Sequence, residues 1–226
     1  MTASAPRTHH IYIVGAQCTG KTSIVSALES HFGEGSSDNR PVIVRDVARN
    51  VLAQHSFTPA DITSSSDRCL ALQKLILEAQ AQTEKTALEQ PDCKFLISDG
   101  SGVDPISCCM RYIGQDGAAA LLETTEWHEL EARLRTSLIV VCEAAVDRLT
   151  DDGVRLTPSE YEDWRAFHVL SCGLLDRLGL DYVVLPCEIT QLSDQVDFIL
   201  SRWRARASGM ETSGSSLSGG GVWGLS

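Results

Sequence analysis

The sequence predicts an α/β fold in which helices cover both faces of a parallel sheet of five strands. Short apolar runs rich in β-branched residues alternate along the chain with longer segments of helical periodicity, an alternation that is typical of parallel sheets. The chain has 226 residues, of which 43% are hydrophobic. A chain of this size and composition can bury one substantial core, so one main domain is expected.

The expected strands are short apolar segments. The first of them contains Ile11, Tyr12, Ile13 and Val14, a run with the character of a buried strand. In chain order, the five expected strands cover residues 10–14, 41–45, 94–98, 137–142 and 181–185.

The expected helices repeat apolar residues along one face. In the second of them a stripe that includes Leu72, Ile76 and Ala79 runs on until Pro91 ends the helix. These helices cover residues 21–32, 66–89, 126–135, 159–178 and 189–203. We therefore expect a folded domain over residues 10–206, between a disordered N-terminus (1–9) and a disordered tail (207–226) dominated by serine and glycine.

Charge and cysteine content restrict the function classes. A net charge of −11 argues against general affinity for nucleic acid or an acidic membrane, because like charges repel. No apolar stretch approaches the length of a membrane span, and the first residues lack the hydrophobic segment of a secretory signal. The eight cysteines show no C-x-x-C spacing, which favours reduced, mostly buried thiols over disulfides or zinc ligands. A cytoplasmic protein is expected.

A glycine-rich motif follows the first expected strand. It matches the phosphate-binding P-loop pattern G-x-x-x-x-G-K-[ST] and consists of Gly15, Ala16, Gln17, Cys18, Thr19, Gly20, Lys21 and Thr22. The glycines allow positive φ, so that successive backbone N–H groups can point at a phosphate. Lys21 brings a positive charge to the β- and γ-phosphates, and the Thr22 hydroxyl is a natural Mg²⁺ ligand.

The surroundings of this motif support a nucleotide site. Strand, glycine loop and helix is the arrangement that the motif requires, because the helix dipole adds to the amide cradle. ATP is preferred over GTP, since the sequence contains no N-K-x-D-type segment. The motif thus predicts binding of ATP with Mg²⁺.

Asp99 ends the third expected strand, Phe95-Leu96-Ile97-Ser98-Asp99. An apolar strand that closes on an aspartate is the Walker B arrangement, in which the carboxylate orients Mg²⁺, usually through water. Ligands of open parallel sheets bind at the carboxyl ends of the strands. Asp99 is therefore the expected second magnesium residue beside Thr22.

Asp46 and Arg49 follow the second expected strand. They are three residues apart, so on a helix they share a face and can act on one ligand. In a phosphoryl-transfer pocket Asp46 could accept the proton of an acceptor hydroxyl, and Arg49 could steady the transferring phosphoryl group. With equal weight, Asp46 is a helix N-cap and Arg49 a surface residue.

A polar segment follows the fourth expected strand. Its glycine and proline suggest a flap over residues 147–158, from which Arg148 or Arg155 could close over the phosphates. The alternative is a turn followed by an N-cap at Thr157 or Ser159.

Five segments together resemble the NadR-type P-loop ATPase/kinase family, which is allied to the nicotinamide-riboside kinase domain. The segments are GAQCTGKT (15–22), RDVAR (45–49), ISDGSGVDPI (97–106), VVCEA (140–144) and DDGVRLTP (151–158). The resemblance extends from His10 to about Trp203. It implies a kinase-like three-layer fold with strand order 2-3-1-4-5, ATP with Mg²⁺, and phosphoryl transfer to a small molecule or hydrolysis.

The sequence departs from the family pattern at two positions. Asp46 stands where the family usually has glutamate, which shortens the reach of the carboxylate by one methylene. Gly100 stands where an arginine commonly follows the aspartate, and a bidentate guanidinium is hard to replace. ATP binding should survive this second change, whereas catalysis on the family's substrate is put at risk.

The leading hypothesis is an ATP-dependent small-molecule kinase. Lys21 and Arg155 would stabilise the transferring phosphoryl group, Thr22 and Asp99 would hold Mg²⁺, and Asp46 would act as base. A nucleoside-like acceptor is implied by the resemblance alone. The alternative is a nucleotide-dependent switch with slow hydrolysis at most, favoured by Gly100 and by a tail that could dock a protein partner. The intact P-loop argues against a scaffold that binds no nucleotide.

Overall fold

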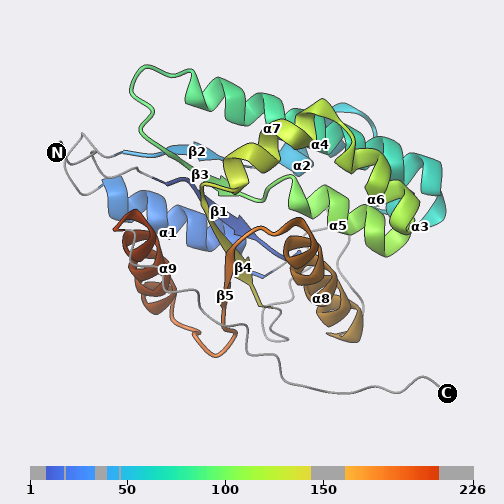
Figure 1. The fold of residues 1–226 in the computed structure, drawn as a ribbon. Helices are drawn as coiled ribbons and strands as arrows, with labels where there is room; N and C mark the ends of the chain where they lie inside the picture. Colours follow the sequence, from blue (N-terminus) through green and yellow to red (C-terminus); the bar gives the residue numbers. More distant parts are fainter. Residues whose placement is uncertain (1–8, 18, 34–39, 46, 144–160, 209–226) are drawn as a thin grey trace.

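Five parallel strands form the centre of the molecule (Figure 1). The computed structural model describes residues 9–17, 19–33, 40–45, 47–143 and 161–208. The strands are β1 (Ile11–Val14), β2 (Val42–Val44), β3 (Leu96–Asp99), β4 (Leu138–Cys142) and β5 (Tyr182–Leu185). Their order is β2-β3-β1-β4-β5, as the resemblance implied. In the central strand, Ile13 lies opposite Asp99 of β3 and Val140 of β4.

Helices cover both faces of this sheet. One face packs against α1 (Lys21–Gly33) and α9 (Leu192–Ala207). On the other side lie α4 (Ser66–Leu88), α5 (Val103–Tyr112), α6 (Gln115–Leu122), α7 (Thr125–Leu134) and α8 (Tyr161–Leu178). The short helices α2 (Val47–Gln54) and α3 (Ala60–Ser64) pack against α4. This is the expected three-layer α/β arrangement.

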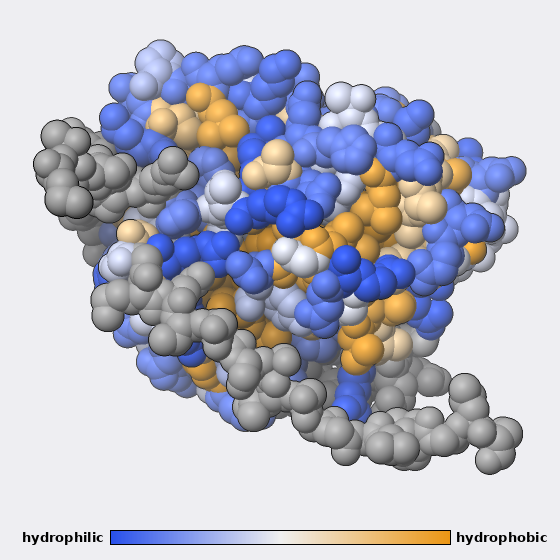
Figure 2. Space-filling view, viewed as in Figure 1, coloured by the Kyte–Doolittle hydropathy of each residue, from blue (hydrophilic) through white to orange (hydrophobic). Residues whose placement is uncertain are grey.

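The core follows the alternation of the strands. Ile11 and Ile13 point toward α1 and α9, whereas Tyr12 and Val14 point toward the opposite helix layer, and all four are buried. Figure 2 shows one face of the molecule, on which hydrophilic residues predominate and hydrophobic residues form patches among them. In the described part of the chain, the exposed large hydrophobic side chains are Val169 and Leu192.

The predicted strands and long helices are confirmed, with ends shifted by a few residues. The expected helix 189–203 begins at Leu192 and continues to Ala207, one residue past the expected domain end. The helices α2, α3, α5 and α6 were not among the expected helices, because they are short and the last two carry or border Pro105, Gly114 and Gly117. Pro105 is tolerated because it lies in the first turn of α5, where no N–H donor is needed. The expected disordered ends fall mostly on residues 1–8 and 209–226, outside the described residues.

Four of the seven described cysteines are buried, whereas Cys93, Cys172 and Cys187 are partly exposed. Cys69, Cys108, Cys109 and Cys142 are buried, and the described cysteines are free thiols. Among the helices described, none has the length and apolar character needed to cross a bilayer.

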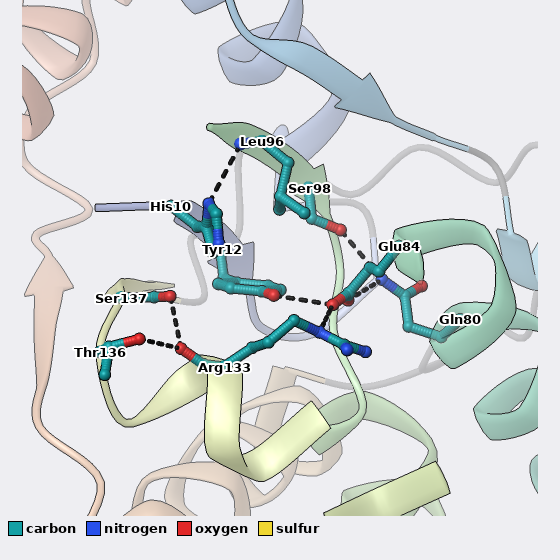
Figure 3. A network of polar contacts seen from close by, with 9 residues as sticks. All are labelled: His10, Tyr12, Gln80, Glu84, Leu96, Ser98, Arg133, Thr136 and Ser137. Atoms are coloured by element: carbon teal, nitrogen blue, oxygen red, sulfur yellow. Dashed lines mark hydrogen bonds and ion pairs between the residues drawn. The ribbon is translucent and has the colours of Figure 1, made fainter. Parts of the chain in front are cut away.

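A buried polar network joins the helix layer to the sheet (Figure 3). Its centre is the carboxylate of Glu84 on α4, which is fully buried and accepts hydrogen bonds from the Tyr12 hydroxyl, Gln80 Nε2 and Arg133 Nε, each at 2.8 Å. Gln80 Nε2 also donates to Ser98 Oγ on β3 at 3.0 Å. Burial raises the pKa of Glu84, and the three donors oppose that rise. The network therefore fixes β1 and β3 just before the residues expected to bind nucleotide.

We expect His10 to make the stability of the protein sensitive to acid. Its Nδ1 accepts a hydrogen bond from the Leu96 amide at 3.2 Å, which requires the neutral ring. Burial lowers the pKa of His10, and Arg133 and His9 act in the same direction. Because the folded-state pKa lies below the unfolded one, this contribution to stability is complete above the unfolded value of about 6.5 and is lost as the pH falls through the folded pKa.

Urea unfolding between about pH 7.5 and about pH 5, the range in which histidine titrates, measures this effect. The free energy of unfolding of the wild type should fall with pH, and His10→Asn, which keeps an acceptor oxygen, should flatten part of that fall. His55→Asn, at an exposed position after α2, is the matched control and should behave as wild type. Identical pH dependence in His10→Asn and wild type would contradict the prediction.

Candidate nucleotide-binding site

The glycine loop connects β1 to α1, as predicted. Gly15 and Gly20 adopt φ of +135° and +83°, a region that favours glycine. Gly15 is also required by space, because a Cβ there would lie 2.8 Å from the carbonyl oxygen of Cys142 on β4. Cys18 lies outside the described residues. Both glycines of the P-loop pattern, Gly15 and Gly20, thus have the positive φ that allows a loop to turn its amides toward a phosphate.

The Lys21 ammonium group is hydrogen-bonded to the backbone of its own loop. Its Nζ donates to the carbonyl oxygens of Gly15 at 2.9 Å and Ala16 at 2.7 Å, and only 8% of the residue is exposed. The Thr19 hydroxyl donates to the Ala16 carbonyl at 2.9 Å. The ammonium group is therefore held at the loop, where a bound phosphate would meet it.

The two expected magnesium residues are in contact. Thr22 Oγ1, at the start of α1, donates to Asp99 Oδ2, at the end of β3, at 2.5 Å. A hydroxyl and a carboxylate are oxygen ligands of the type that Mg²⁺ prefers, together with phosphate oxygens and water. The residues present therefore fit a magnesium ion bound with a nucleotide.

Helix α8 supports the loop from outside. The indole Nε1 of Trp164 donates to the Gln17 carbonyl at 2.7 Å, and its ring packs against Ala16 and Phe167. Trp164 is fully buried. Helical periodicity predicted an apolar position for this tryptophan but did not indicate its contact with the loop.

A pocket opens beside the loop, between α2, α4 and α5. At one side it is bounded by Gly15, Ala16, Gln17, Lys21, Asp99 and Gly100. The remaining wall is mostly apolar and includes Val47, Leu52, Ile62, Leu72, Ile76, Pro105, Cys108 and Phe167. Four polar side chains interrupt it, from Arg49, Gln73, Asp104 and Tyr112. The pocket thus has a charged end, formed by the glycine loop with Lys21 and Asp99, and an apolar chamber beside it. We call the charged end the phosphate end.

Most predicted site residues converge here. Lys21, Asp99 and Arg49 line the same pocket, and Thr22 is joined to it through Asp99. Arg49 lies on the pocket wall, and its role toward a ligand stays a prediction. Asp46, Arg148 and Arg155 lie outside the described residues, so their roles stay predictions.

Asp104 was missed by sequence reasoning. Its Oδ2 accepts a hydrogen bond from the Ser101 amide at 2.6 Å, and its Oδ1 accepts one from the Gly15 amide at 3.4 Å. Burial raises the pKa of Asp104 and Asp99 adds to the rise, while Lys21 and the two amides oppose it. The available signal was its position before Pro105, in the first turn of a helix that begins at the carboxyl edge of the sheet.

Gly100 cannot be exchanged for a larger residue without strain. Its φ is +96°, and a Cβ there would lie 3.2 Å from Asp104 Oδ2. We expect Gly100→Ala to lower the free energy of unfolding by about 1–2 kcal/mol, the cost of a left-handed conformation for a residue with a Cβ. Gly100→Arg should be destabilised at least as much, so one substitution would not recreate the arginine of the family pattern.

Chemical unfolding of Gly100→Ala and Gly173→Ala tests this. At Gly173, inside α8, an added Cβ would meet no atom within 4 Å, so alanine should be neutral or stabilising by up to about 1 kcal/mol. Equal stability changes in the two variants would refute the argument from backbone conformation.

Comparisons with known proteins agree with this architecture. Residues 10–191 match the model of a protein family described as AAA domain. A search of curated proteins found no match.

Three solved structures share the fold. A NadR protein in complex with NAD and AMP-PNP is 16% identical with a TM-score of 0.64, and the alignment covers 93% of this chain and 52% of that one. For a NadR protein in complex with NR, the identity is 18%, the TM-score 0.66, and the coverage 94% and 54%. Deoxyadenosine kinase from M. mycoides with bound dATP is 14% identical with a TM-score of 0.55, and the alignment covers 87% and 99%. The chain thus spans about half the length of the NadR chains.

Proposed function

This chain belongs to the AAA-domain family whose model spans residues 10–191, and from that premise we propose that it transfers a phosphoryl group from ATP, bound with Mg²⁺, to a small acceptor. Family membership and the fold shared with the NadR structures confirm the resemblance to NadR-type P-loop proteins. We place this activity in the cytoplasm on the basis of composition alone.

The observation that carries the proposal is the junction of two different environments in one pocket. The loop with Lys21, and the pair Thr22 and Asp99, supply the cation and the oxygen ligands that a Mg²⁺-bound triphosphate needs. Directly beside them lies the apolar chamber between α2, α4 and α5. A second, differently lined chamber next to the phosphate end is what transfer to an acceptor molecule requires.

Individual roles follow from these positions. Lys21 would contact the β- and γ-phosphates, and Thr22 with Asp99 would hold Mg²⁺. Arg49, on the pocket wall, would steady the transferring phosphoryl group. The sequence predicts Asp46 as a candidate base and Arg155 as a second phosphate contact, and both assignments stay predictions because these residues lie outside the described ones.

The chamber suits a nucleoside-like acceptor. Its apolar side chains can pack against a planar ring, and the buried carboxamide of Gln73 offers a donor and an acceptor for ring heteroatoms. Two of the similar structures hold small ligands, since one NadR protein is in complex with NR and the deoxyadenosine kinase has bound dATP.

Incubation with γ-labelled ATP, Mg²⁺ and a panel of nucleosides that includes nicotinamide riboside tests the proposal. We expect label to pass to at least one nucleoside in the wild type and to none in Lys21→Ala. Transfer to no nucleoside, in a protein that calorimetry shows to bind ATP, would overturn it.

A nucleotide-dependent switch with slow hydrolysis remains the second candidate function because of Gly100. Its positive φ and the 3.2 Å approach of a Cβ to Asp104 Oδ2 disfavour, at this position, the arginine of the family pattern. ATP consumption that no acceptor accelerates, together with a partner bound only in the presence of nucleotide, would favour this alternative. The serine- and glycine-rich tail is the segment that would dock such a partner.

A further inference from the structure

We propose that Asp104 is a catalytic base that removes the proton from the acceptor hydroxyl, an inference that rests on the phosphoryl transfer proposed above. Asp104 lies where the two parts of the pocket meet. On one side are the Gly15 amide, Lys21 and Asp99, and on the other are Pro105 and Cys108 of the same helix, which form part of the chamber wall. A hydroxyl of an acceptor in the chamber would therefore face both Asp104 and the phosphate end.

The carboxylate of Asp104 is held in place by the backbone. Both of its oxygens accept hydrogen bonds from main-chain amides, those of Ser101 and Gly15, which cannot rotate away as side chains do. A carboxylate oxygen has two lone pairs, so each oxygen keeps one for a further donor. Gly100 leaves the approach open, because even a single Cβ at this position would come within 3.2 Å of Oδ2.

The surroundings also adjust the basicity of this group. Burial raises the pKa of Asp104, and the neighbouring Asp99 raises it further, whereas Lys21 and the two amides act in the opposite direction. The geometry of Asp104, at the junction of the phosphate loop and the apolar chamber, is what places it beside an acceptor hydroxyl.

In the proposed step, proton transfer to Asp104 accompanies transfer of the γ-phosphoryl group. The acceptor hydroxyl gives its proton to a carboxylate oxygen of Asp104, and its oxygen forms a bond to the γ-phosphorus. The bond from that phosphorus to the β,γ-bridging oxygen breaks, and its electron pair leaves with ADP. Asp104 later releases the proton to water. The products are the phosphorylated acceptor, ADP and one proton.

The sequence nominates Asp46 for the same task, so the experiment compares the two carboxylates. The rate of phosphorylation of the best nucleoside of the panel is measured across pH in the wild type, Asp104→Asn and Asp46→Asn, with the Kd for ATP and the melting temperature of each. Asp116→Asn, at an exposed position on α6, is the control and should match the wild type.

We expect Asp104→Asn to lower kcat by about 100-fold or more, the usual contribution of a positioned base, and to lose the acidic limb of the pH profile. The Kd for ATP should change much less than kcat, because the hydrogen bond of Asp104 to the phosphate loop is a long one, to the Gly15 amide at 3.4 Å. If Asp104→Asn melts too low for assay, Asp104→Glu keeps the carboxylate and should show a displaced acidic limb.

Three results would overturn the proposal. The first is a kcat of Asp104→Asn close to wild type, and the second is an acidic limb that Asp46→Asn loses and Asp104→Asn keeps. Both leave the proposed kinase function standing. The third is a wild type that binds ATP but phosphorylates no nucleoside, in which case the kinase function fails and the role of Asp104 fails with it.

Discussion

Replacement of Lys21 by alanine should weaken ATP binding by at least about 100-fold, which corresponds to about 2.8 kcal/mol. Lys21 is the cation held at the glycine loop, with its Nζ 2.9 Å from the Gly15 carbonyl and 2.7 Å from the Ala16 carbonyl. Without it, the β- and γ-phosphates would lose their main charge-assisted side-chain contact. The loop would also lose a group that satisfies two of its carbonyl oxygens, so some loss of stability should accompany the loss of affinity.

Titration calorimetry with ATP and Mg²⁺ measures this effect. Lys85→Ala, at an exposed position on α4, removes the same charge far from the loop and should bind ATP as the wild type does. Circular dichroism separates lost binding from lost folding, because Lys21→Ala should keep its helix signal. If Lys21→Ala bound ATP as tightly as the wild type, the assignment of the nucleotide site would be wrong.

Replacement of Glu84 by alanine should lower the free energy of unfolding by about 3–5 kcal/mol, the range found when one partner of a buried ion pair is removed. The change would leave Arg133 Nε and the Tyr12 hydroxyl without their acceptor inside the core, and it would remove one of the two acceptors of Gln80. It would also leave a cavity under β1 and β3.

Glu84→Gln separates the charge from the hydrogen bonds. A glutamine keeps an acceptor oxygen of similar reach, and burial already raises the pKa of Glu84, which shows that its surroundings disfavour the charged form. We therefore expect Glu84→Gln to lose clearly less stability than Glu84→Ala. Glu89→Ala, at the exposed end of α4, is the control. A loss below about 1 kcal/mol in Glu84→Ala would place the network among weak surface-like ion pairs and contradict the prediction.

Local patterns were sufficient for the main elements and for the phosphate end of the site. Short apolar runs located the five strands and helical repeats located the long helices, because the residues that form the core stand in those runs and repeats. The P-loop pattern and the strand ending in Asp99 predicted two groups that the structure brings into contact, Thr22 and Asp99. Both motifs are contiguous in the sequence, and their geometry follows from the strand–loop–helix connection.

Features that depend on contacts between distant segments could not be predicted from local sequence patterns. The order of the strands came from a resemblance, since periodicity carries no information on lateral order. Glu84 stands in an amphipathic helix like any solvent-facing acid, and only its approach to Tyr12, 72 residues away, makes it a core residue. Asp104 was hidden for a similar reason, because its partner Gly15 is 89 residues distant. The pocket itself arises only when α2, α4 and α5 come together.

The contact between Trp164 and the carbonyl of Gln17 gives the molecule a natural optical reporter. Indole emission depends on hydrogen bonding and on the polarity around the ring, and this ring touches the loop that is proposed to bind phosphate. Of the other three tryptophans, Trp127 and Trp203 are buried in the two layers on opposite faces of the sheet and would contribute a steady background. Trp223 lies outside the described residues, and a Trp223→Phe variant removes its emission. Occupancy of the loop can thus be followed as a change in fluorescence of the unlabelled chain, at equilibrium or in a stopped-flow mixer.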